Sequence, residues 1–172
     1  MSTIEKYRKE IHFFTAFILL FFGFQAVHFF IRPHIAPFVV HTLTTAGSAK
    51  LINLVMPKEK TRAQNEYLVS GSFKLKIARG CEGIEGVIIL AAAILAFPTG
   101  LKPKILGLAG GVLVLYILNL FRIVGLYYTL RYKPPLFDIM HVYVGQTLII
   151  FFAFLYFIAW LNLLMVFHGK DE

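Results

Sequence analysis

Four long apolar runs constrain the fold of this chain more than any other feature of the sequence. They lie between His12 and Ile31, between Ile84 and Phe97, between Ile105 and Leu130, and between Val142 and Phe167. A helix needs about 20 mostly apolar residues to cross a hydrocarbon core of about 30 Å. The second run is short, and it needs residues from Gly80 onward to cross fully. The sequence therefore predicts an all-α polytopic membrane protein with about four transmembrane helices.

The composition agrees with this fold class. Hydrophobic residues make up 58% of the 172 positions and charged residues 15%, whereas soluble domains contain about 25% charged residues. We expect one integral membrane domain over residues 1–172, with spans at about 12–31, 82–98, 105–130 and 141–167. The first apolar run exceeds the roughly 7–15 residues of a signal peptide, and no cleavage site follows promptly. We therefore interpret this run as a retained anchor.

The long connection at residues 32–80 predicts two kinds of structure in an external loop. Its first part, PHIAPFVVHTLTTAGSAKLINLVM, is apolar but is interrupted by two prolines, a glycine and Lys50. This pattern is typical of a helix that lies in the membrane interface. Its second part, NEYLVSGSFKLKI, alternates apolar and polar residues around Ser-Gly-Ser, which predicts a short β-hairpin. The hairpin would bring Cys81 to the membrane surface.

The net charge of +8 indicates an anionic partner. The basic residues are scattered over every loop instead of forming one patch, which argues against nucleic acid and favours lipid headgroups. The bias of Lys and Arg in the short loops favours a cytoplasmic N-terminus by a small margin. With four crossings, both termini are then expected to be cytoplasmic.

Four crossings also bring three reactive side chains to one face of the membrane. Cys81 opens the second span, Arg122 lies in the outer part of the third (LNLFRIVGLYY), and His141 opens the fourth (FDIMHVYVGQ). A histidine beside a thiol can act as its general base, and an arginine can stabilise the oxyanion that forms when a carbonyl is attacked. These three residue types predict acyl-transfer chemistry.

Each of the three residues also has an ordinary structural explanation. Cys81 can be a small buried hydrophobe, Arg122 can extend toward the headgroups, and His141 can be an interfacial histidine with a satisfied hydrogen bond. Two arguments favour function. A thiol at a helix N-terminus near Arg79 is in an electropositive setting that produces a thiolate, and an arginine inside an apolar run costs about 3 kcal/mol.

Four further residues are candidates for substrate binding. Asn119 lies one helical turn before Arg122, so it can hold the guanidinium or a substrate carbonyl. Glu82 and Glu85 are explained equally well by favourable charge at a helix N-terminus and by contact with a substrate. Arg79, next to the cysteine motif, completes this predicted set.

At these residues the sequence resembles the exosortase/archaeosortase family of integral membrane cysteine transpeptidases. The resemblance rests on CEG at Cys81–Gly83, NLFR at Asn119–Arg122, and His141 followed by Gly145, and it covers roughly residues 65–160. It implies that the cysteine is the nucleophile and that the arginine and the histidine are its catalytic partners. Many members are longer, with extra N-terminal spans, so the resemblance implies a compact member.

The resemblance also implies a substrate class and an orientation. The family acts on secreted proteins with a C-terminal sorting signal, which consists of a short motif, a transmembrane helix and a basic cluster. We therefore expect cleavage near such a motif and transfer to an acceptor. The active site is expected to face the periplasm or the cell exterior from the inner (plasma) membrane. We predict no cofactor and no metal.

Two other classes of protein stay open. In a b-type cytochrome, two bis-histidine haem sites can be drawn between the first and fourth spans, from His12 with His168 and from His28 with His141. A non-catalytic scaffold or small transporter is the other alternative, and it predicts that Cys81 tolerates alanine. A zinc protease is disfavoured because the sequence contains no H-E-x-x-H motif.

Overall fold

The computed structural model describes residues 7–78 and 80–168. The prediction of an all-α polytopic protein is confirmed, with one small sheet added to it. The elements in chain order are α2 (Arg8–Ala36), η1 (Pro37–Thr45), α3 (Ala46–Val55), η2 (Pro57–Glu59), β1 (Arg62–Gln64), β2 (Tyr67–Ser70), β3 (Phe73–Lys76), α4 (Ile84–Ala96), α5 (Leu101–Tyr132), η3 (Pro134–Leu136), η4 (Ile139–Val144) and α6 (Gly145–His168).

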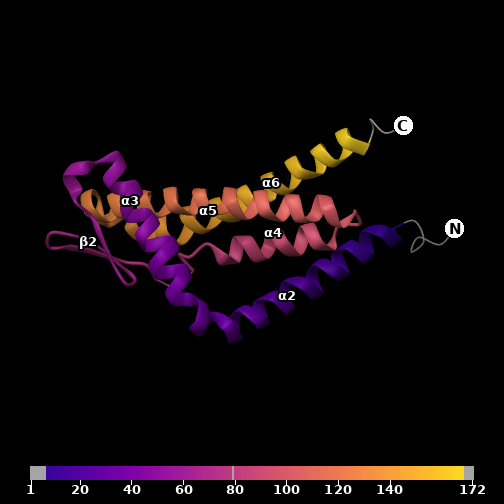
Figure 1. The fold of residues 1–172 in the computed structure, drawn as a ribbon, viewed down its shortest axis with the longest axis horizontal. Helices are drawn as coiled ribbons and strands as arrows, with labels where there is room; N and C mark the ends of the chain where they lie inside the picture. The colour runs from indigo at the N-terminus through magenta and orange to yellow at the C-terminus, as the bar shows by residue number, and fades with distance from the viewer. Residues whose placement is uncertain (1–6, 79, 169–172) are drawn as a thin grey trace.

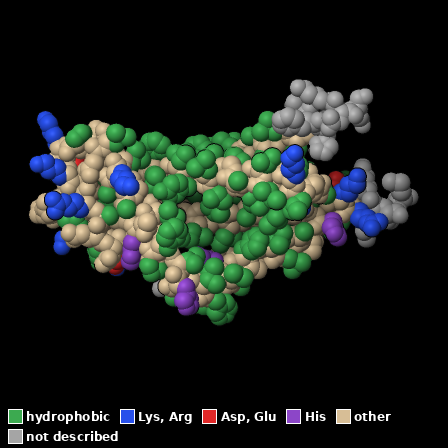
Figure 2. All heavy atoms as spheres, viewed as in Figure 1, with side chains coloured by type: hydrophobic (Ala, Val, Ile, Leu, Met, Phe, Trp, Pro, Cys, Tyr) green, Lys and Arg blue, Asp and Glu red, His purple; other side chains and the backbone are tan. Residues whose placement is uncertain are grey.

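The helices form an elongated bundle with the sheet at one end (Figure 1). α4, α5 and α6 lie side by side along the long axis, and α2 crosses them obliquely. α2 begins and α6 ends at the same end of the molecule, opposite the sheet and α3. Hydrophobic side chains cover the middle of the visible face, whereas most Lys and Arg side chains lie toward its two ends (Figure 2). This distribution is expected for a protein that spans a bilayer.

Three helical segments of the described chain are long and apolar enough to cross a membrane, at Arg8–Val55, Leu101–Tyr132 and Ile139–Met165. The fourth apolar helix, α4, has 13 residues and is therefore about 20 Å long at 1.5 Å per residue. The 32 residues of α5 give about 48 Å. α5 therefore exceeds the thickness of the hydrocarbon core, and α4 falls short of it.

The first span and the predicted interfacial helix form one continuous helical run instead of two separate elements. Pro33 lies inside α2, and Pro37 begins the nine-residue π-helix η1, after which the chain continues directly into α3. The run changes direction near η1 (Figure 1), as expected where prolines and wider helical turns interrupt the regular hydrogen-bond ladder. α3 packs against α5.

Glycines allow the three central helices to approach closely, because small residues let helix backbones pack tightly in a membrane. A side chain at Gly86 of α4 would overlap Ile149 of α6, and one at Gly111 of α5 would overlap Leu90 of α4. Gly107 is similarly covered by Trp160. α4 therefore lies in the groove between α5 and α6 with little space between the backbones.

The predicted hairpin is confirmed, and it is part of a three-stranded antiparallel sheet in the order β1-β2-β3. Tyr67 pairs with Lys76 and Ser70 with Phe73, across the turn at Gly71. Gly71 has a φ of +58°, which glycine adopts at little cost. Leu68 and Leu75 are buried in one core cluster with side chains from the C-terminal half of α5. β3 leads directly to the segment that contains Cys81.

A buried carboxylate attaches the sheet to α5. Glu59 is 8% exposed, and it accepts hydrogen bonds from Tyr127 Oη at 2.8 Å, Tyr132 Oη at 2.9 Å and Ser70 Oγ at 3.2 Å. Arg131 Nη1 lies 3.0 Å from the same carboxylate. Burial by itself would raise the pKa of Glu59, but the tyrosine hydrogen bonds and the Arg131 charge outweigh it and lower the pKa. The ionised form is therefore the one that the fold stabilises.

Glu59→Gln is expected to destabilise the protein by roughly 1–3 kcal/mol at pH 7, because a charged acceptor is lost while its donors stay in place. A carboxyl group with a lowered pKa stabilises the fold above its ordinary pKa of 4.5, and this contribution is lost as the pH falls through the native value. The melting temperatures of the wild type and the variant should therefore converge in acid. Thermal unfolding in detergent between pH 7 and pH 3 measures this.

The matched control is Glu66→Gln. The side chain of Glu66 is 33% exposed and lies 3.9 Å from Lys76, so its removal should cost less than about 1 kcal/mol. Equal destabilisation by the two variants would contradict the role assigned to Glu59.

Candidate active site

The structure brings Cys81 and His141 together, although 60 positions separate them in the sequence. The distance from Cys81 Sγ to His141 Nδ1 is 3.6 Å, which is within hydrogen-bond range for sulfur. Cys81 precedes α4 and is 3% exposed, and it belongs to the core cluster beneath the sheet. The chain contains one cysteine, so this thiol has no disulfide partner within it.

His141 is held by its own helix and by an aromatic neighbour. It lies in η4, a six-residue π-helix that continues directly into α6, and short π-helical segments are frequent at functional sites. The ring of Phe137 stacks on the imidazole, with centroids 5.5 Å apart and an angle of 3° between the planes. This stack fixes the plane of the imidazole, so Nδ1 is directed at the sulfur.

The segment Gly80–Gly83, which we name the cysteine loop, is fastened to α5 through its backbone. Asn119 Nδ2 donates to the carbonyl oxygen of Cys81 at 3.0 Å, and Arg122 Nη1 donates to that of Gly80 at 3.2 Å. Arg122 Nη1 also lies 3.5 Å from Asn119 Oδ1, as the spacing of one helical turn predicts. Asn119 is 1% exposed, so its amide is dedicated to these contacts.

Two glycines allow this arrangement. Gly83 has a φ of +78°, a conformation that strongly favours glycine, and a Cβ there would lie 2.9 Å from Asn119 Cγ. A Cβ at Gly145 would lie 2.6 Å from Arg122 Nε. The glycines of the CEG motif and after His141 therefore provide the space in which Asn119 and Arg122 reach the loop.

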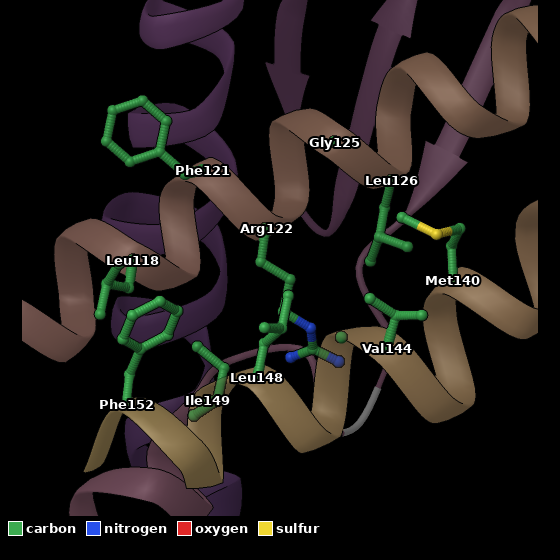
Figure 3. Close-up of a pocket in the computed structure, with 11 residues that line it drawn as sticks. Leu118, Phe121, Arg122, Gly125, Leu126, Met140, Val144, Leu148, Ile149 and Phe152 are labelled. Atoms are coloured by element: carbon green, nitrogen blue, oxygen red, sulfur yellow. The ribbon is translucent and has the colours of Figure 1, made fainter. Parts of the chain in front are cut away.

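Arg122 extends from α5 toward α6 among apolar side chains (Figure 3). It lines a cavity of about 260 Å³ whose other walls are apolar side chains and two glycines. Within the described residues, Nε is buried and has no hydrogen-bond acceptor. The guanidinium therefore contacts the cysteine loop through Nη1 and has one further N–H donor, at Nε, that makes no bond to the loop.

The surroundings of Cys81 include charges of both signs. The thiol is buried, and it lies near the positive charge of Arg122 and the negative charges of Glu82 and Glu85, which act on it in opposite directions. A cavity of about 90 Å³ adjoins the sulfur and is lined by Phe137 and His141 among others. A cavity of this size holds a few water molecules or one small side chain.

The remaining predicted binding residues have different surroundings. Glu82 accepts hydrogen bonds from Arg32 and from the backbone N–H of Gly80, both at 2.6 Å. Glu85 is partly exposed in the first turn of α4. Arg79 lies outside the described residues. The roles of these side chains in substrate binding stay predictions.

Sequence reasoning missed Phe137 and Arg32. Phe137 precedes His141 by four positions, which places both on one face of a helix, and this spacing was an available signal. No pattern in the sequence links Arg32 with Glu82, which is 50 positions away.

The first of the two histidine pairs of the haem alternative is only partly described by the structure. His12 is exposed on α2, and the side chain of His168 lies outside the described residues. Among the residues described, no cluster of three or more His, Cys, Asp or Glu side chains is suited to a metal ion.

Gly83→Ala is expected to destabilise the protein more than Gly80→Ala. Both glycines have positive φ values, +78° and +84°, so each alanine adds backbone strain of about 1 kcal/mol. Only the Cβ at position 83 also overlaps Asn119, whereas a Cβ at position 80 meets nothing within 4 Å. Thermal unfolding and the rate of Cys81 alkylation measure the difference. Equal effects of the two substitutions would show that the contact with Asn119 is unimportant.

The sequence was also compared with known proteins. The profile of the transmembrane exosortase family matches residues 7–160, which include all three of the residues predicted to be catalytic. No significant match is found among curated proteins or among solved structures. The matched region covers most of the chain and extends beyond residues 65–160, which contain the motifs of the resemblance. The chain therefore belongs to the transmembrane exosortase family.

Proposed function

We propose that this protein is a membrane-embedded cysteine transpeptidase that cleaves the C-terminal sorting signals of exported proteins and transfers them to an acceptor. Membership of the exosortase family supports a membrane protease or transpeptidase in general. The observation that carries the specific proposal is the distance of 3.6 Å between Cys81 Sγ and His141 Nδ1. Nucleophile and base within hydrogen-bond reach are the signature of covalent catalysis.

In the first half of the reaction, His141 Nδ1 removes the proton from the Cys81 thiol, and the sulfur attacks the carbonyl carbon of the scissile peptide bond. The carbonyl oxygen becomes an oxyanion, which the Arg122 guanidinium stabilises. The carbon–nitrogen bond then breaks, and the leaving amine takes the proton from His141. The product is a thioester between Cys81 and the N-terminal part of the substrate.

In the second half, the nucleophile of the acceptor attacks the thioester. His141 removes its proton, the bond from carbon to Cys81 Sγ breaks, and the proton passes to the sulfur. The thiol and the neutral imidazole are restored, so the cycle needs no cofactor. Arg122 stabilises the second oxyanion as it did the first.

The binding residues have proposed roles around this centre. Asn119 holds the carbonyl of the cysteine loop and keeps the Arg122 guanidinium beside it. Glu85 and Arg79 contact the substrate near the scissile bond. The site faces the periplasm or the cell exterior of a multi-pass protein in the inner membrane, because its substrates are exported.

The first test separates Cys81 from His141. Cys81→Ala and Cys81→Ser should both leave a co-expressed substrate uncut, since neither offers an easily ionised thiol. His141→Ala should still be alkylated by iodoacetamide, but it should process substrate about 10²–10⁴-fold more slowly because no group returns the proton to the leaving amine. Substrate cleavage on gels and alkylation by mass spectrometry measure both properties.

The control for His141→Ala is His34→Ala, which removes an exposed histidine of α2 and should process substrate normally. Normal processing by Cys81→Ala would refute the peptidase proposal and favour the scaffold alternative. A Soret band in the purified wild type would favour the cytochrome.

The second test concerns the planar guanidinium. Arg122→Lys keeps the positive charge but loses the fork that reaches the Gly80 carbonyl and the oxyanion together. We expect processing to fall about 10²–10³-fold while the amount of protein in the membrane stays normal. Arg62→Lys on the exposed strand β1 is the matched control. Wild-type activity of Arg122→Lys would instead support an arginine that only extends toward the headgroups.

A further inference from the structure

Glu82 is held entirely by groups of the protein itself. Its side chain is 4% exposed. One carboxylate oxygen accepts from Arg32 Nη2 at 2.6 Å, and the other accepts from the backbone N–H of Gly80 at 2.6 Å. Both are short, charge-assisted hydrogen bonds. The residue next to Cys81 in the sequence therefore connects the cysteine loop to α2.

The ion pair between Arg32 and Glu82 connects α2 to the cysteine loop. Within the described part of the chain, no other ion pair joins α2 to another element, and no side chain of α2 is fully buried. α2 does pack along α4. Its polar attachment to the cysteine loop thus depends on Arg32.

The contacts of Gly80 show what this attachment does. Its N–H donates to the carboxylate of Glu82, which also accepts from Arg32. Its carbonyl oxygen accepts from Arg122 of α5. Gly80 has a φ of +84°, so the loop turns sharply at this peptide. Two arginines from different helices therefore fix the turn that precedes Cys81, one directly and one through a carboxylate.

Arg32 also counters the charge of Glu82. A carboxylate beside Cys81 opposes formation of a thiolate, and an opposite charge 2.6 Å from it reduces that effect. Among the described residues, Glu85 and Arg122 also act on the thiol through their charges, His141 lies 3.6 Å from it, and Lys76 lines the cavity beside it. None of them belongs to α2.

We propose that Arg32 is a positioning residue for Cys81, which fixes the cysteine loop and neutralises the adjacent carboxylate through its bond to Glu82. The proposal rests on the proposed function only in taking Cys81 as the reactive residue. It assigns α2 a direct part in the site. Glu82 then acts within the protein, in contrast to the substrate contact that the sequence left open.

The single cysteine makes the test direct, because alkylation of the full-length protein in detergent reports on Cys81 alone. The rate of reaction with iodoacetamide is measured from pH 6 to pH 10 for the wild type, Arg32→Gln, Arg32→Lys and Glu82→Gln. Arg32→Gln should move the midpoint upward by about one pH unit, which is a tenfold lower rate well below the midpoint. Arg32→Lys should retain the wild-type midpoint, because it keeps the charge.

Glu82→Gln should move the midpoint downward, because it removes the negative charge and leaves Arg32 uncompensated. If Arg32→Gln does not accumulate in the membrane, the midpoint of Glu82→Gln tests the proposal by itself. Arg62→Gln, which removes an exposed arginine on β1, should match the wild type. An unchanged midpoint in folded Arg32→Gln, or in Glu82→Gln, would overturn the proposal.

Processing of a co-expressed substrate distinguishes this proposal from the proposed function. If the wild type processes no substrate but the midpoints shift as expected, the function fails and the positioning role stands. If processing is normal in the wild type and the midpoints do not shift, the positioning role alone fails. A contact between Glu82 and substrate would instead raise KM in Glu82→Gln without moving its alkylation midpoint.

Discussion

The backbone carbonyl groups of the cysteine loop need hydrogen-bond donors, and the side chains of the site supply them. A break between a strand and a membrane helix leaves peptide groups without helical partners, and an unsatisfied peptide group in an apolar environment costs several kcal/mol. Asn119 and Arg122 supply the missing donors for the carbonyls of Cys81 and Gly80. The same two side chains therefore make the irregular loop possible and hold the thiol near His141. One set of hydrogen bonds therefore both satisfies the loop backbone and positions the thiol.

The sheet is part of this arrangement. The hydrogen bonds from Tyr127 and Tyr132 to Glu59 fasten the sheet to the C-terminal turns of α5. β3 is followed directly by the segment that leads to the cysteine loop. The C-terminal turns of α5 thus hold the sheet that precedes the loop. The helical turn that contains Asn119 and Arg122 holds the loop itself. A single helix of 32 residues therefore positions the sheet and Cys81, and it also carries Arg122. His141 joins this frame through α6, which packs against both α4 and α5.

Periodic and local features of the structure were predictable from the sequence, and contacts without a local pattern were not. Apolar runs predict helices in a bilayer, alternation around Ser-Gly-Ser predicts the hairpin, and the number of crossings brings Cys81 and His141 to one face. β1 was missed because three exposed residues carry no alternating pattern. The continuous run from α2 to α3 was missed because two prolines predict a break, which the π-helix η1 absorbs. The pairing of Arg32 with Glu82 depends on how α2 packs, and single-residue patterns carry no information on that.

The shortness of α4 determines how deep the thiol lies. With the far end of α4, next to Lys102 and Lys104, at one headgroup layer, a helix of 13 residues reaches about 20 Å into a core of about 30 Å. Ile84, the first residue of α4, then lies about 10 Å inside the opposite boundary of the hydrocarbon, and Cys81 lies three positions closer to that boundary in the sequence. Water is scarcer inside the hydrocarbon than at its surface, so the thioester of the proposed reaction would meet less water in this recess. The proposed transpeptidase would have to give its acceptor an advantage over water, and the length of one helix is the feature that would supply it.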